Sequence, residues 1–507
     1  MKREIEVFEL FTIKESIEWS LKTEALVIGL YQDQKKLSGV AEEIDALLDG
    51  YVTEYLRDGE VRAEFKTVSK VHTLGKIGAK RIYFVGLGKK QQLTAERISQ
   101  VFGKLTKVLY NDEIEEMSLL FDSFQENHLN RTKHLSKAIA ESILLASYRF
   151  ADYKEKDNRL IKKLEQVTIY SKQNKEDLKQ GLKKGAAYGE GTNFARTLVN
   201  IPANLLTPTD LADYAQEIAE KYEMEIEILE KEEMEKLGMG ALLAVNQGTD
   251  QPPKMIVLKY QGRKEWNQVV SFVGKGVTYD SGGLSIKTRE GMIDMKSDMG
   301  GAAAVLGAMD VIGKLKPEIN LLAVIPTAEN LINGSALKPG DVITSLSGKT
   351  IEVLNTDAEG RLILADGITY AKQLGANYLV DVATLTGAAV IALGESTTGA
   401  LTNNKEWYEK VEKSAEVAGE YMWLLPSFDF YKKMVKSSSI ADLNNSPGRP
   451  AGAITAGLFL GEFAGVTPWV HLDIAGPSYT KRSSDLNPKG GTGVMVRTLA
   501  ELALTFS

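Results

Sequence analysis

The residues best suited to chemistry begin with one short acidic segment. Residues 355–361 read Asn-Thr-Asp-Ala-Glu-Gly-Arg, which places Asp357 two positions before Glu359 and Arg361 two positions after it. In extended backbone this spacing puts both side chains on one side of the chain, where their carboxylates can converge on a cation. The arginine could hold an anion through two parallel hydrogen bonds. An acidic surface turn with an incidental arginine explains these seven residues equally well, because short motifs often match by chance.

A second acidic region upstream favours the chemical interpretation. Residues 273–287 add one carboxylate and two lysines to the set, and residues 295–302 add a second carboxylate. The full set is Asp280, Asp298, Asp357 and Glu359 with Lys275 and Lys287. Gathering four carboxylates without compensation would cost several kcal/mol or force protonation. Two divalent cations would balance them, so the sequence predicts a dinuclear metal site.

The donor types leave the metal open and give the two lysines different roles. Carboxylates favour a hard cation, but zinc also accepts their oxygens. A lysine beside a dication is pushed toward its neutral form and could complete a coordination sphere, which is the role expected of Lys275. A lysine one step further away stays charged and could polarise a carbonyl, which is the role expected of Lys287.

This predicted site is suited to hydrolysis. Two metals roughly 3.5 to 4 Å apart polarise a carbonyl, lower the pKa of a bridging water and orient the substrate. A free α-amine could coordinate one of them. The amino terminus of a peptide is therefore the expected substrate.

A serine nucleophile is the competing interpretation of the same region. Residues 280–283 read Asp-Ser-Gly-Gly, which resembles part of the nucleophile segment of trypsin-like serine proteases. The sequence has only four histidines, and no second signal of a catalytic triad accompanies Ser281. His471 lies in an apolar run and is predicted to be a hydrogen-bonded core residue rather than a ligand.

Composition limits the classes of function. With 507 residues, 43% hydrophobic and 25% charged, the chain has the composition of a globular protein of two or three domains. A net charge of -7 argues against nucleic acid as the main partner, because phosphate binding needs clustered Lys and Arg. The absence of cysteine excludes disulfides and thiolate ligands and fits a reducing compartment. Residues 1–15 lack a signal-peptide core and no apolar run suits a bilayer, so we expect no membrane association and a cytoplasmic location.

Residues 1–173 are predicted to form a smaller α/β domain. Strands are expected at residues 5–10, 25–31, 81–86, 117–121 and 167–171, and helices at 94–110 and 133–147. The Gly-Leu-Gly at 86–88 is predicted to be a turn, because the third glycine of a dinucleotide-binding loop is missing. Residues 174–198 are predicted to link the two domains through a helix that begins at Lys175.

Residues 199–507 are predicted to form a larger domain whose central mixed sheet is flanked by helices. The expected strands are 225–229, 254–260, 269–273, 320–325, 350–354, 378–384 and 469–474, with helices at 301–315, 362–374 and 451–463. Another helix is expected to be capped by Thr209 or Asp210 and to end at Tyr222. The acidic segment 355–361 would then lie where a strand gives way to a helix. Ligands gather outside the carboxyl ends of strands in α/β sheets.

These segments together resemble a known family. Residues 273–287, 295–304, 355–362, 381–387 and 471–476 are similar, in order and with closely similar gaps, to the signature segments of the leucyl aminopeptidases, also called cytosol aminopeptidases. The similarity is dense from about residue 193 onward, while the first domain resembles the family only in its macro-like architecture. The resemblance implies an aminopeptidase that removes leucine and other apolar amino-terminal residues with two divalent ions, Mn²⁺ or Zn²⁺.

The resemblance also implies roles for individual residues. Lys275, Asp280, Asp298 and Glu359 would hold the tighter metal, and Asp280, Asp357 and Glu359 the more exchangeable one. Lys287 would polarise the scissile carbonyl, and Arg361 would bind a bicarbonate that accepts a proton from the bridging water. The substrate-binding residues would be Met295, Asn355, Thr384, Leu385, Gly387 and Ala475.

Further properties follow from the resemblance alone. Family members are usually homohexamers, so this assembly is expected here. Tyr279 and residues 477–478 depart from the common family pattern, which leaves the side-chain preference open. A nucleic-acid-binding regulator and a non-catalytic scaffold are the alternative functions. The acidic charge disfavours the first, and the presence of every expected ligand disfavours the second.

Overall fold

The computed structural model describes residues 10–34, 36–125, 132–150, 153 and 164–506. By its internal contacts the chain divides into two compact units. The first runs to Glu190 and includes Arg482–Pro488, and the second comprises Gly191–Lys481 and Lys489–Ser507. Both are α/β, and the second is the larger, which confirms the predicted fold class.

The first unit is built on one six-stranded sheet. Its strands, in spatial order, are β1 (Phe11–Lys14), β6 (Gln166–Tyr170), β5 (Glu116–Leu120), β2 (Thr23–Tyr31), β4 (Ala79–Gly88) and β3 (Val68–His72). All neighbouring pairs are parallel except β3 with β4. Adjacent β2 residues point to opposite faces, so Val27 joins one apolar core and Ile28 another.

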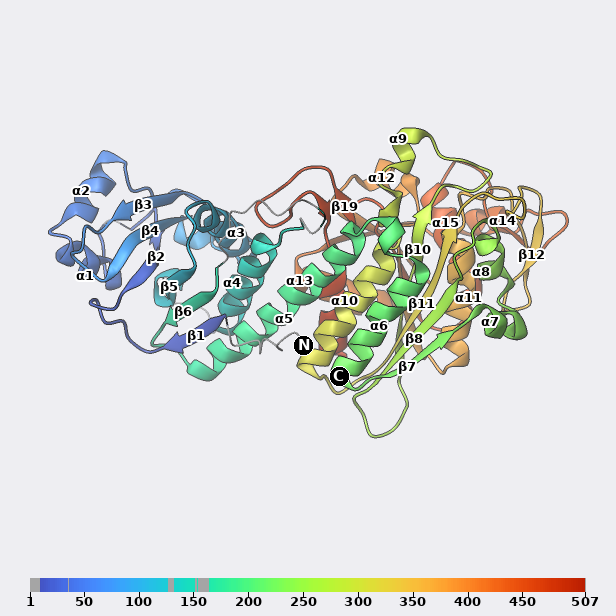
Figure 1. The fold of residues 1–507 in the computed structure, drawn as a ribbon, viewed down its shortest axis with the longest axis horizontal. Helices are drawn as coiled ribbons and strands as arrows, with labels where there is room; N and C mark the ends of the chain where they lie inside the picture. The colour runs from blue at the N-terminus through green and yellow to red at the C-terminus, as the bar shows by residue number, and fades with distance from the viewer. Residues whose placement is uncertain (1–9, 35, 126–131, 151–152, 154–163, 507) are drawn as a thin grey trace. The chain divides into compact units, whose positions relative to one another are not determined.

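Helices cover both faces of this sheet. The core around Val27 takes in α3 (Ala95–Asn111), α4 (Thr132–Ser147) and part of α5 (Lys175–Asn200). The core around Ile28 takes in α1 (Val40–Leu47) and α2 (Tyr51–Asp58) (Figure 1). A layered arrangement of this kind follows from strands that are apolar on both sides.

Three details of the first unit differ from the sequence predictions. Most of the strand expected at residues 5–10 lies outside the described residues, and β1 begins at Phe11. The half-exposed edge strand β3 was not predicted. Residues 86–88 are not a turn but the end of β4. Leu87 is buried there, and a Cβ on Gly86 would overlap the carbonyl of Glu64, so Gly86 serves close packing rather than a turn.

The second unit contains the large mixed sheet expected from the sequence. In spatial order its strands are β16 (Tyr421–Leu424), β15 (Thr397–Thr402), β18 (Trp469–Asp473), β14 (Tyr378–Ala383), β9 (Val270–Gly274), β11 (Asn320–Asn330), β8 (Lys254–Gln261) and β7 (Glu225–Leu229), with β10 (Gly276–Asp280) beside β11. The central strands β18, β14, β9 and β11 run parallel. Strands β15, β8 and β7 run antiparallel to their inner neighbours.

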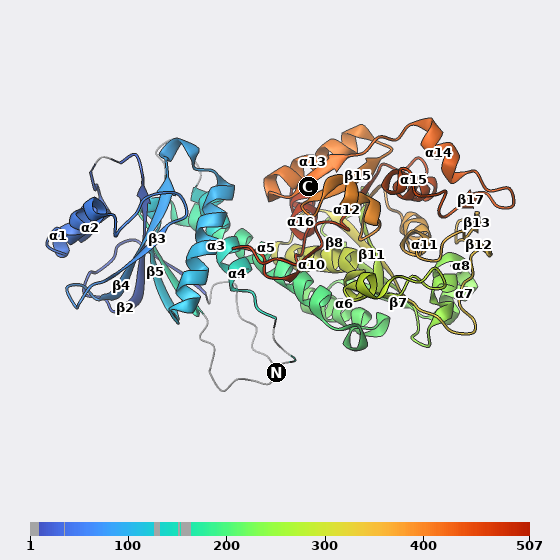
Figure 2. The same cartoon turned by 90° about the horizontal axis from the view of Figure 1, so that it is seen from above.

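Helices again lie on both faces of the second sheet. One layer contains α6 (Pro208–Tyr222), α10 (Gly300–Leu315), α13 (Lys405–Ala418) and α16 (Val496–Thr505). The other contains α8 (Gly240–Val245), α11 (Gly360–Gln373) and α15 (Gly452–Ala464), as seen from above in Figure 2. Helices α10 and α11 are buried along most of their length, so their amino-terminal ends are rigidly placed beside the sheet.

Two expectations for the second unit are corrected. Strand β13 (Thr350–Glu352) belongs to a separate three-stranded sheet with β12 (Val342–Thr344) and β17 (Leu443–Asn444), so the acidic segment does not follow a strand of the main sheet. Helix α6 is capped by Thr207, not by Thr209 or Asp210. Thr207 Oγ1 accepts from Asp210 N, and the Asp210 side chain accepts from Thr207 N, which together form a capping box with Pro208 in the first turn.

Among the described residues, no helix combines the length and the apolar character needed to cross a membrane.

Candidate functional site

One cleft in the second unit brings the predicted site residues together. It has a volume of about 900 Å³ and lies at the carboxyl ends of β10 and β14 and the amino-terminal ends of α10 and α11. It is lined by all the residues that the sequence assigned to metal binding, catalysis or substrate binding: Lys275, Asp280, Lys287, Met295, Asp298, Asn355, Asp357, Glu359, Arg361, Thr384, Leu385, Gly387 and Ala475. Elements far apart in sequence therefore build one site.

The four carboxylates come from four different places in the fold. Asp280 ends β10, Asp298 precedes α10, Asp357 lies in a turn, and Glu359 immediately precedes α11. One oxygen each from Asp280, Asp357 and Glu359 lies within 4.8 Å of the others. Residues 356–357 form a turn just before α11, and the Asp357 carboxylate converges with that of Glu359.

The carboxylates are unequally buried. Asp280, Asp298 and Glu359 expose only 3%, 6% and 1% of their surface. The side chain of Asp357 is 33% exposed. Burial raises the pKa of Asp280, Asp298 and Asp357, because a buried carboxylate loses its hydration.

Lys275 lies between the carboxylates of Asp298 and Glu359. Its Nζ is 2.7 Å from Asp298 Oδ2 and 2.9 Å from Glu359 Oε1. Burial alone would lower the pKa of Lys275, but Asp298, Glu359 and Asp280 outweigh it and raise that pKa above its ordinary value. Lys275 is therefore charged when it pairs with these carboxylates, whereas the sequence argument expects a neutral amine beside a bound dication.

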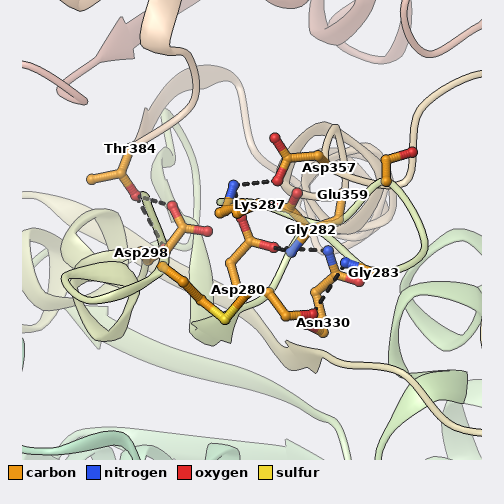
Figure 3. Close-up of polar contacts among 12 residues, drawn as sticks. Asp280, Gly282, Gly283, Lys287, Asp298, Asn330, Asp357, Glu359 and Thr384 are labelled. Atoms are coloured by element: carbon orange, nitrogen blue, oxygen red, sulfur yellow. Dashed lines mark hydrogen bonds and ion pairs between the residues drawn. The ribbon is translucent and has the colours of Figure 1, made fainter. Parts of the chain in front are cut away.

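Lys287 lies on the more open side of the carboxylates. Its Nζ is 2.7 Å from Asp280 Oδ2 and also contacts Asp357, as Figure 3 shows. Burial lowers the pKa of Lys287, but the negative charges of Asp280, Glu359 and Asp357 raise this pKa by more than burial lowers it. The amine is therefore also charged. The two lysines act as internal counter-ions for the acidic groups.

Gly360 has a role that the sequence did not reveal. From sequence it would only permit a sharp turn, but it is the first residue of α11 and lies directly against Lys275. A Cβ at this position would overlap the aliphatic part of the Lys275 side chain. The glycine thus leaves the space through which the lysine reaches Asp298 and Glu359.

The donor set fits a bound cation. The carboxylates outnumber the two lysines that pair with them, and one oxygen of Glu359, Oε2, is buried without a hydrogen-bond partner among the described residues. An unpaired buried carboxylate oxygen is costly unless a cation or another donor satisfies it. Three oxygens within 4.8 Å of one another form a suitable pocket for such an ion.

Arg361 provides a buried guanidinium in the cleft lining. It is 8% exposed, and its Nη1 donates to Asn445 O at 2.6 Å. Its Nε is buried and has no hydrogen-bond partner within the described part of the chain. Burial lowers the pKa of Arg361 to about 10, so the group remains cationic at neutral pH and could hold an anion.

Another wall of the cleft is organised by Asp473, which sequence reasoning missed. This carboxylate is 1% exposed, accepts from Leu385 N at 3.2 Å and from Ala475 N at 3.1 Å, and accepts from Thr386 Oγ1 at 2.7 Å. It therefore joins the loop after β14 to the residues after β18. A lone acidic residue at the end of an apolar strand was the available signal.

Thr384 connects this wall to the carboxylates. Its Oγ1 donates to Asp298 Oδ1 at 2.8 Å, and its carbonyl accepts from Lys275 Nζ at 3.0 Å. Figure 3 shows Thr384 and Asp298 side by side. The same threonine lines the cleft, so the carboxylate cluster and the cleft wall share one residue.

The two residues of the competing serine interpretation are engaged elsewhere. His471 is fully buried in β18, with Nδ1 2.6 Å from Asp381 Oδ1, which agrees with the expected core histidine. The Ser281 hydroxyl donates to the carbonyl of Asn330 at 2.8 Å. The contacts of both side chains are structural.

Comparison with known proteins agrees with this geometry. The family model described as "Cytosol aminopeptidase family, catalytic domain" matches residues 193–500, and the model described as "Cytosol aminopeptidase family, N-terminal domain" matches residues 27–157. The first domain therefore resembles the family in sequence, which corrects the expectation of similarity in architecture alone.

Individual relatives span almost the whole chain. A probable cytosol aminopeptidase of Bacillus subtilis is 56% identical and covers 97% of this chain and 98% of its own, and one of Bacillus licheniformis is 55% identical over 96% and 98%. Among solved structures, the bottromycin maturation enzyme BotP is 32% identical, covers 96% of this chain and 99% of its own, and superposes with a TM-score of 0.83. A structure of BotP in complex with Mn gives a TM-score of 0.84 at the same identity and coverage. The chain belongs to the cytosol aminopeptidase family.

Proposed function

We propose that the protein hydrolyses the amino-terminal residue of peptides and amino-acid amides, with a preference for leucine and other apolar residues. Family membership supports aminopeptidase activity. The observation that carries the proposal is the convergence of Asp280, Asp357 and Glu359 oxygens within 4.8 Å in a cleft that is also lined by Lys275, Lys287 and Arg361. Such a site combines cation ligands with cationic groups that can stabilise developing negative charge.

Two divalent ions per subunit would occupy the carboxylate cluster. Lys275, Asp280, Asp298 and Glu359 would hold one, and Asp280, Asp357 and Glu359 the other. Bound there, such ions would polarise the scissile carbonyl and lower the pKa of a water between them. The similarity to a BotP structure in complex with Mn supports Mn²⁺, and Zn²⁺ would fit the same donors.

The protein's own groups would orient the substrate and stabilise charge. Lys287, displaced from Asp280 and Asp357 by cations, would be free to donate a hydrogen bond to the scissile carbonyl oxygen. Arg361 would hold a bicarbonate, which would supply a proton acceptor. The Nε of Arg361 has no hydrogen-bond partner among the residues that the structure describes, which supports an anion at this position.

The remaining cleft residues would bind the first residue of the peptide. Leu385 and Gly387 would contact it through backbone groups, and Asn355 would contribute from the acidic segment. Met295, Thr384 and Ala475 would surround its side chain, and their predominantly apolar character supports a preference for leucine-like residues.

Location and assembly complete the proposal. The name of the Bacillus relatives supports a cytoplasmic location. A homohexamer rests on the family resemblance alone.

The test is hydrolysis of leucine amide before and after dialysis against a chelator. We expect activity to disappear and to return with Mn²⁺, Zn²⁺ or Co²⁺, and a panel of amino-acid amides to show the highest kcat/KM for leucine-like residues. Activity that is indifferent to chelation would contradict the proposal.

A further inference from the structure

The geometry points to Asn330 as a positioning residue that fixes the direction of the Asp280 carboxylate and thereby sets the affinity of the site for its cation. Asn330 ends β11, beside the end of β10, and is 4% exposed. The inference rests on the proposed function in one respect only, that Asp280 is a metal ligand.

The side-chain amide of Asn330 uses both of its hydrogens within the site. Nδ2 donates to Asp280 Oδ1 at 2.8 Å (Figure 3). It also donates to the carbonyl of Thr356 at 3.0 Å. It therefore joins the strand that carries Asp280 to the segment that carries Asp357 and Glu359. A carboxamide is the only neutral side chain with two donor hydrogens on one atom, so few other residues could make both contacts.

Asp280 is held in one orientation as a result. Its Oδ1 accepts from Asn330 Nδ2 and also from Gly282 N at 2.9 Å. Its other oxygen, Oδ2, then faces Lys287 at 2.7 Å and the shared carboxylate pocket. Two fixed donors on one oxygen leave the second oxygen directed at the position where a cation would lie.

Neighbouring contacts show that this arrangement is tightly built. Thr356 Oγ1 donates to the carbonyl of Gly282 at 2.7 Å and accepts from Ser285 N at 2.8 Å. Gly283 has φ of +62°, and a Cβ there would lie 2.9 Å from Thr356 Oγ1 and 3.0 Å from Asn330 Oδ1. Only a glycine lets the loop after Asp280 approach both side chains so closely.

The contribution of the Asn330 side chain can be separated from that of its backbone. The carbonyl of Asn330 accepts from Ser281 N at 2.9 Å and from Ser281 Oγ at 2.8 Å. A substitution at residue 330 keeps these backbone contacts and removes only the amide donors. The loop after Asp280 should remain in place while the carboxylate loses its fixed direction.

The experiment is a calorimetric titration of the metal-free full-length protein with Mn²⁺, together with the dependence of activity on Mn²⁺ concentration. Two variants are used, Asn330→Ala and Asn330→Asp, the second of which places a carboxylate against Asp280 Oδ1. The control is Asn333→Ala at an exposed position whose side chain accepts a hydrogen bond from Ser335 N.

We expect both Asn330 variants to bind Mn²⁺ about 10- to 100-fold more weakly, which is the usual cost of losing a group that orients a metal ligand. Turnover should largely recover at saturating Mn²⁺, and Asn333→Ala should bind like the wild type. The inference is overturned if the Asn330 variants retain wild-type affinity within twofold, or if they lose only thermal stability. It is equally overturned if Asn333→Ala is weakened to the same extent. A wild-type protein that binds no Mn²⁺ would instead refute the proposed function.

Discussion

Lys287 bridges two of the four carboxylates, because its Nζ lies 2.7 Å from Asp280 Oδ2 and also contacts Asp357. In the proposed reaction this amine turns to the scissile carbonyl. We expect Lys287→Ala to lower kcat by about 10²- to 10³-fold, the typical cost of removing one donor to developing negative charge. Mn²⁺ affinity should not fall, because the lysine competes with cations for the same oxygens. Steady-state kinetics and metal titration test this, and a variant that loses its metal would contradict the assigned role.

Removal of metal should abolish activity without unfolding the protein. Lys275 and Lys287 pair with the carboxylates, so the mutual repulsion of the carboxylates is partly neutralised by the protein itself. We expect the circular dichroism spectrum of the chelated protein to match that of the loaded one, with a higher melting temperature after Mn²⁺ is added. Loss of secondary structure on chelation would show that the lysines do not replace the cations.

Asp473 should affect substrate binding rather than metal binding. It holds Leu385, Thr386 and Ala475 in place through hydrogen bonds, and none of these residues belongs to the carboxylate cluster. We expect Asp473→Ala to raise KM for leucine amide by roughly 10-fold or more, since a buried charge-assisted contact contributes about 1.5 to 3 kcal/mol. The Mn²⁺ titration curve should be unchanged. A parallel loss of metal affinity would place Asp473 in the metal site instead.

Asp366 should make stability depend on pH. Burial raises the pKa of Asp366 to about 7, although its carboxylate accepts from the backbone N–H groups of Ala241, Leu242 and Leu346. Because the folded pKa exceeds the unfolded value of roughly 4, the native state binds the extra proton, so this group's contribution to stability is full below about pH 4 and is lost as pH rises through 7. Asp366→Asn cannot titrate.

The test of this dependence is the difference in unfolding free energy between Asp366→Asn and the wild type at several pH values. We expect the unfolding free energy of the variant, relative to that of the wild type, to increase by about 1 kcal/mol for each pH unit between pH 5 and 7. Any loss of hydrogen bonds in the variant shifts the difference by a constant, so only the slope is diagnostic. A flat difference would mean that Asp366 is already ionised at pH 5.

The capping box at the start of α6 gives a test of local structure. Thr207→Ala removes the cap and should cost about 1 kcal/mol, while Thr209→Ala should stay within about 0.5 kcal/mol of the wild type. Differential scanning calorimetry of the metal-free protein would show the difference as a shift of about 2 °C in the melting of the second unit. A larger shift for Thr209→Ala than for Thr207→Ala would favour a cap at Thr209, one of the two positions expected from the sequence.

The elements predictable from sequence were those with a long, regular apolar pattern. Helices α3, α10 and α11 and strands β2 and β14 lie where hydrophobic periodicity placed them. Strand β10 was missed because it follows β9 after a single residue, and two short strands so close together give one continuous pattern. Helix α13 was also missed, although Trp407, Val411 and Ala415 recur on one face at intervals of four.

The candidate site was predictable as a set of residues but not as a geometry. Charge counting and the family resemblance assigned Asp280, Asp298 and Glu359 to one site, and all three line one cleft. The sequence could not show that Gly360 makes room for Lys275, because that contact joins segments 85 positions apart. Asn330 and Asp473 were missed for a similar reason: each is the last residue of its strand, and most of its side-chain partners lie on other segments.

The unequal burial of the carboxylates bears on how preparations of this protein should be interpreted. A cation resting partly on Asp357, whose side chain is 33% exposed, would exchange readily during dialysis, whereas one enclosed by Asp298 and Glu359 would be retained through purification. Elemental analysis would then detect an ion taken up from the last buffer at the exposed position and an ion taken up from the growth medium at the enclosed position. Samples of identical sequence could differ in activity because of their handling alone.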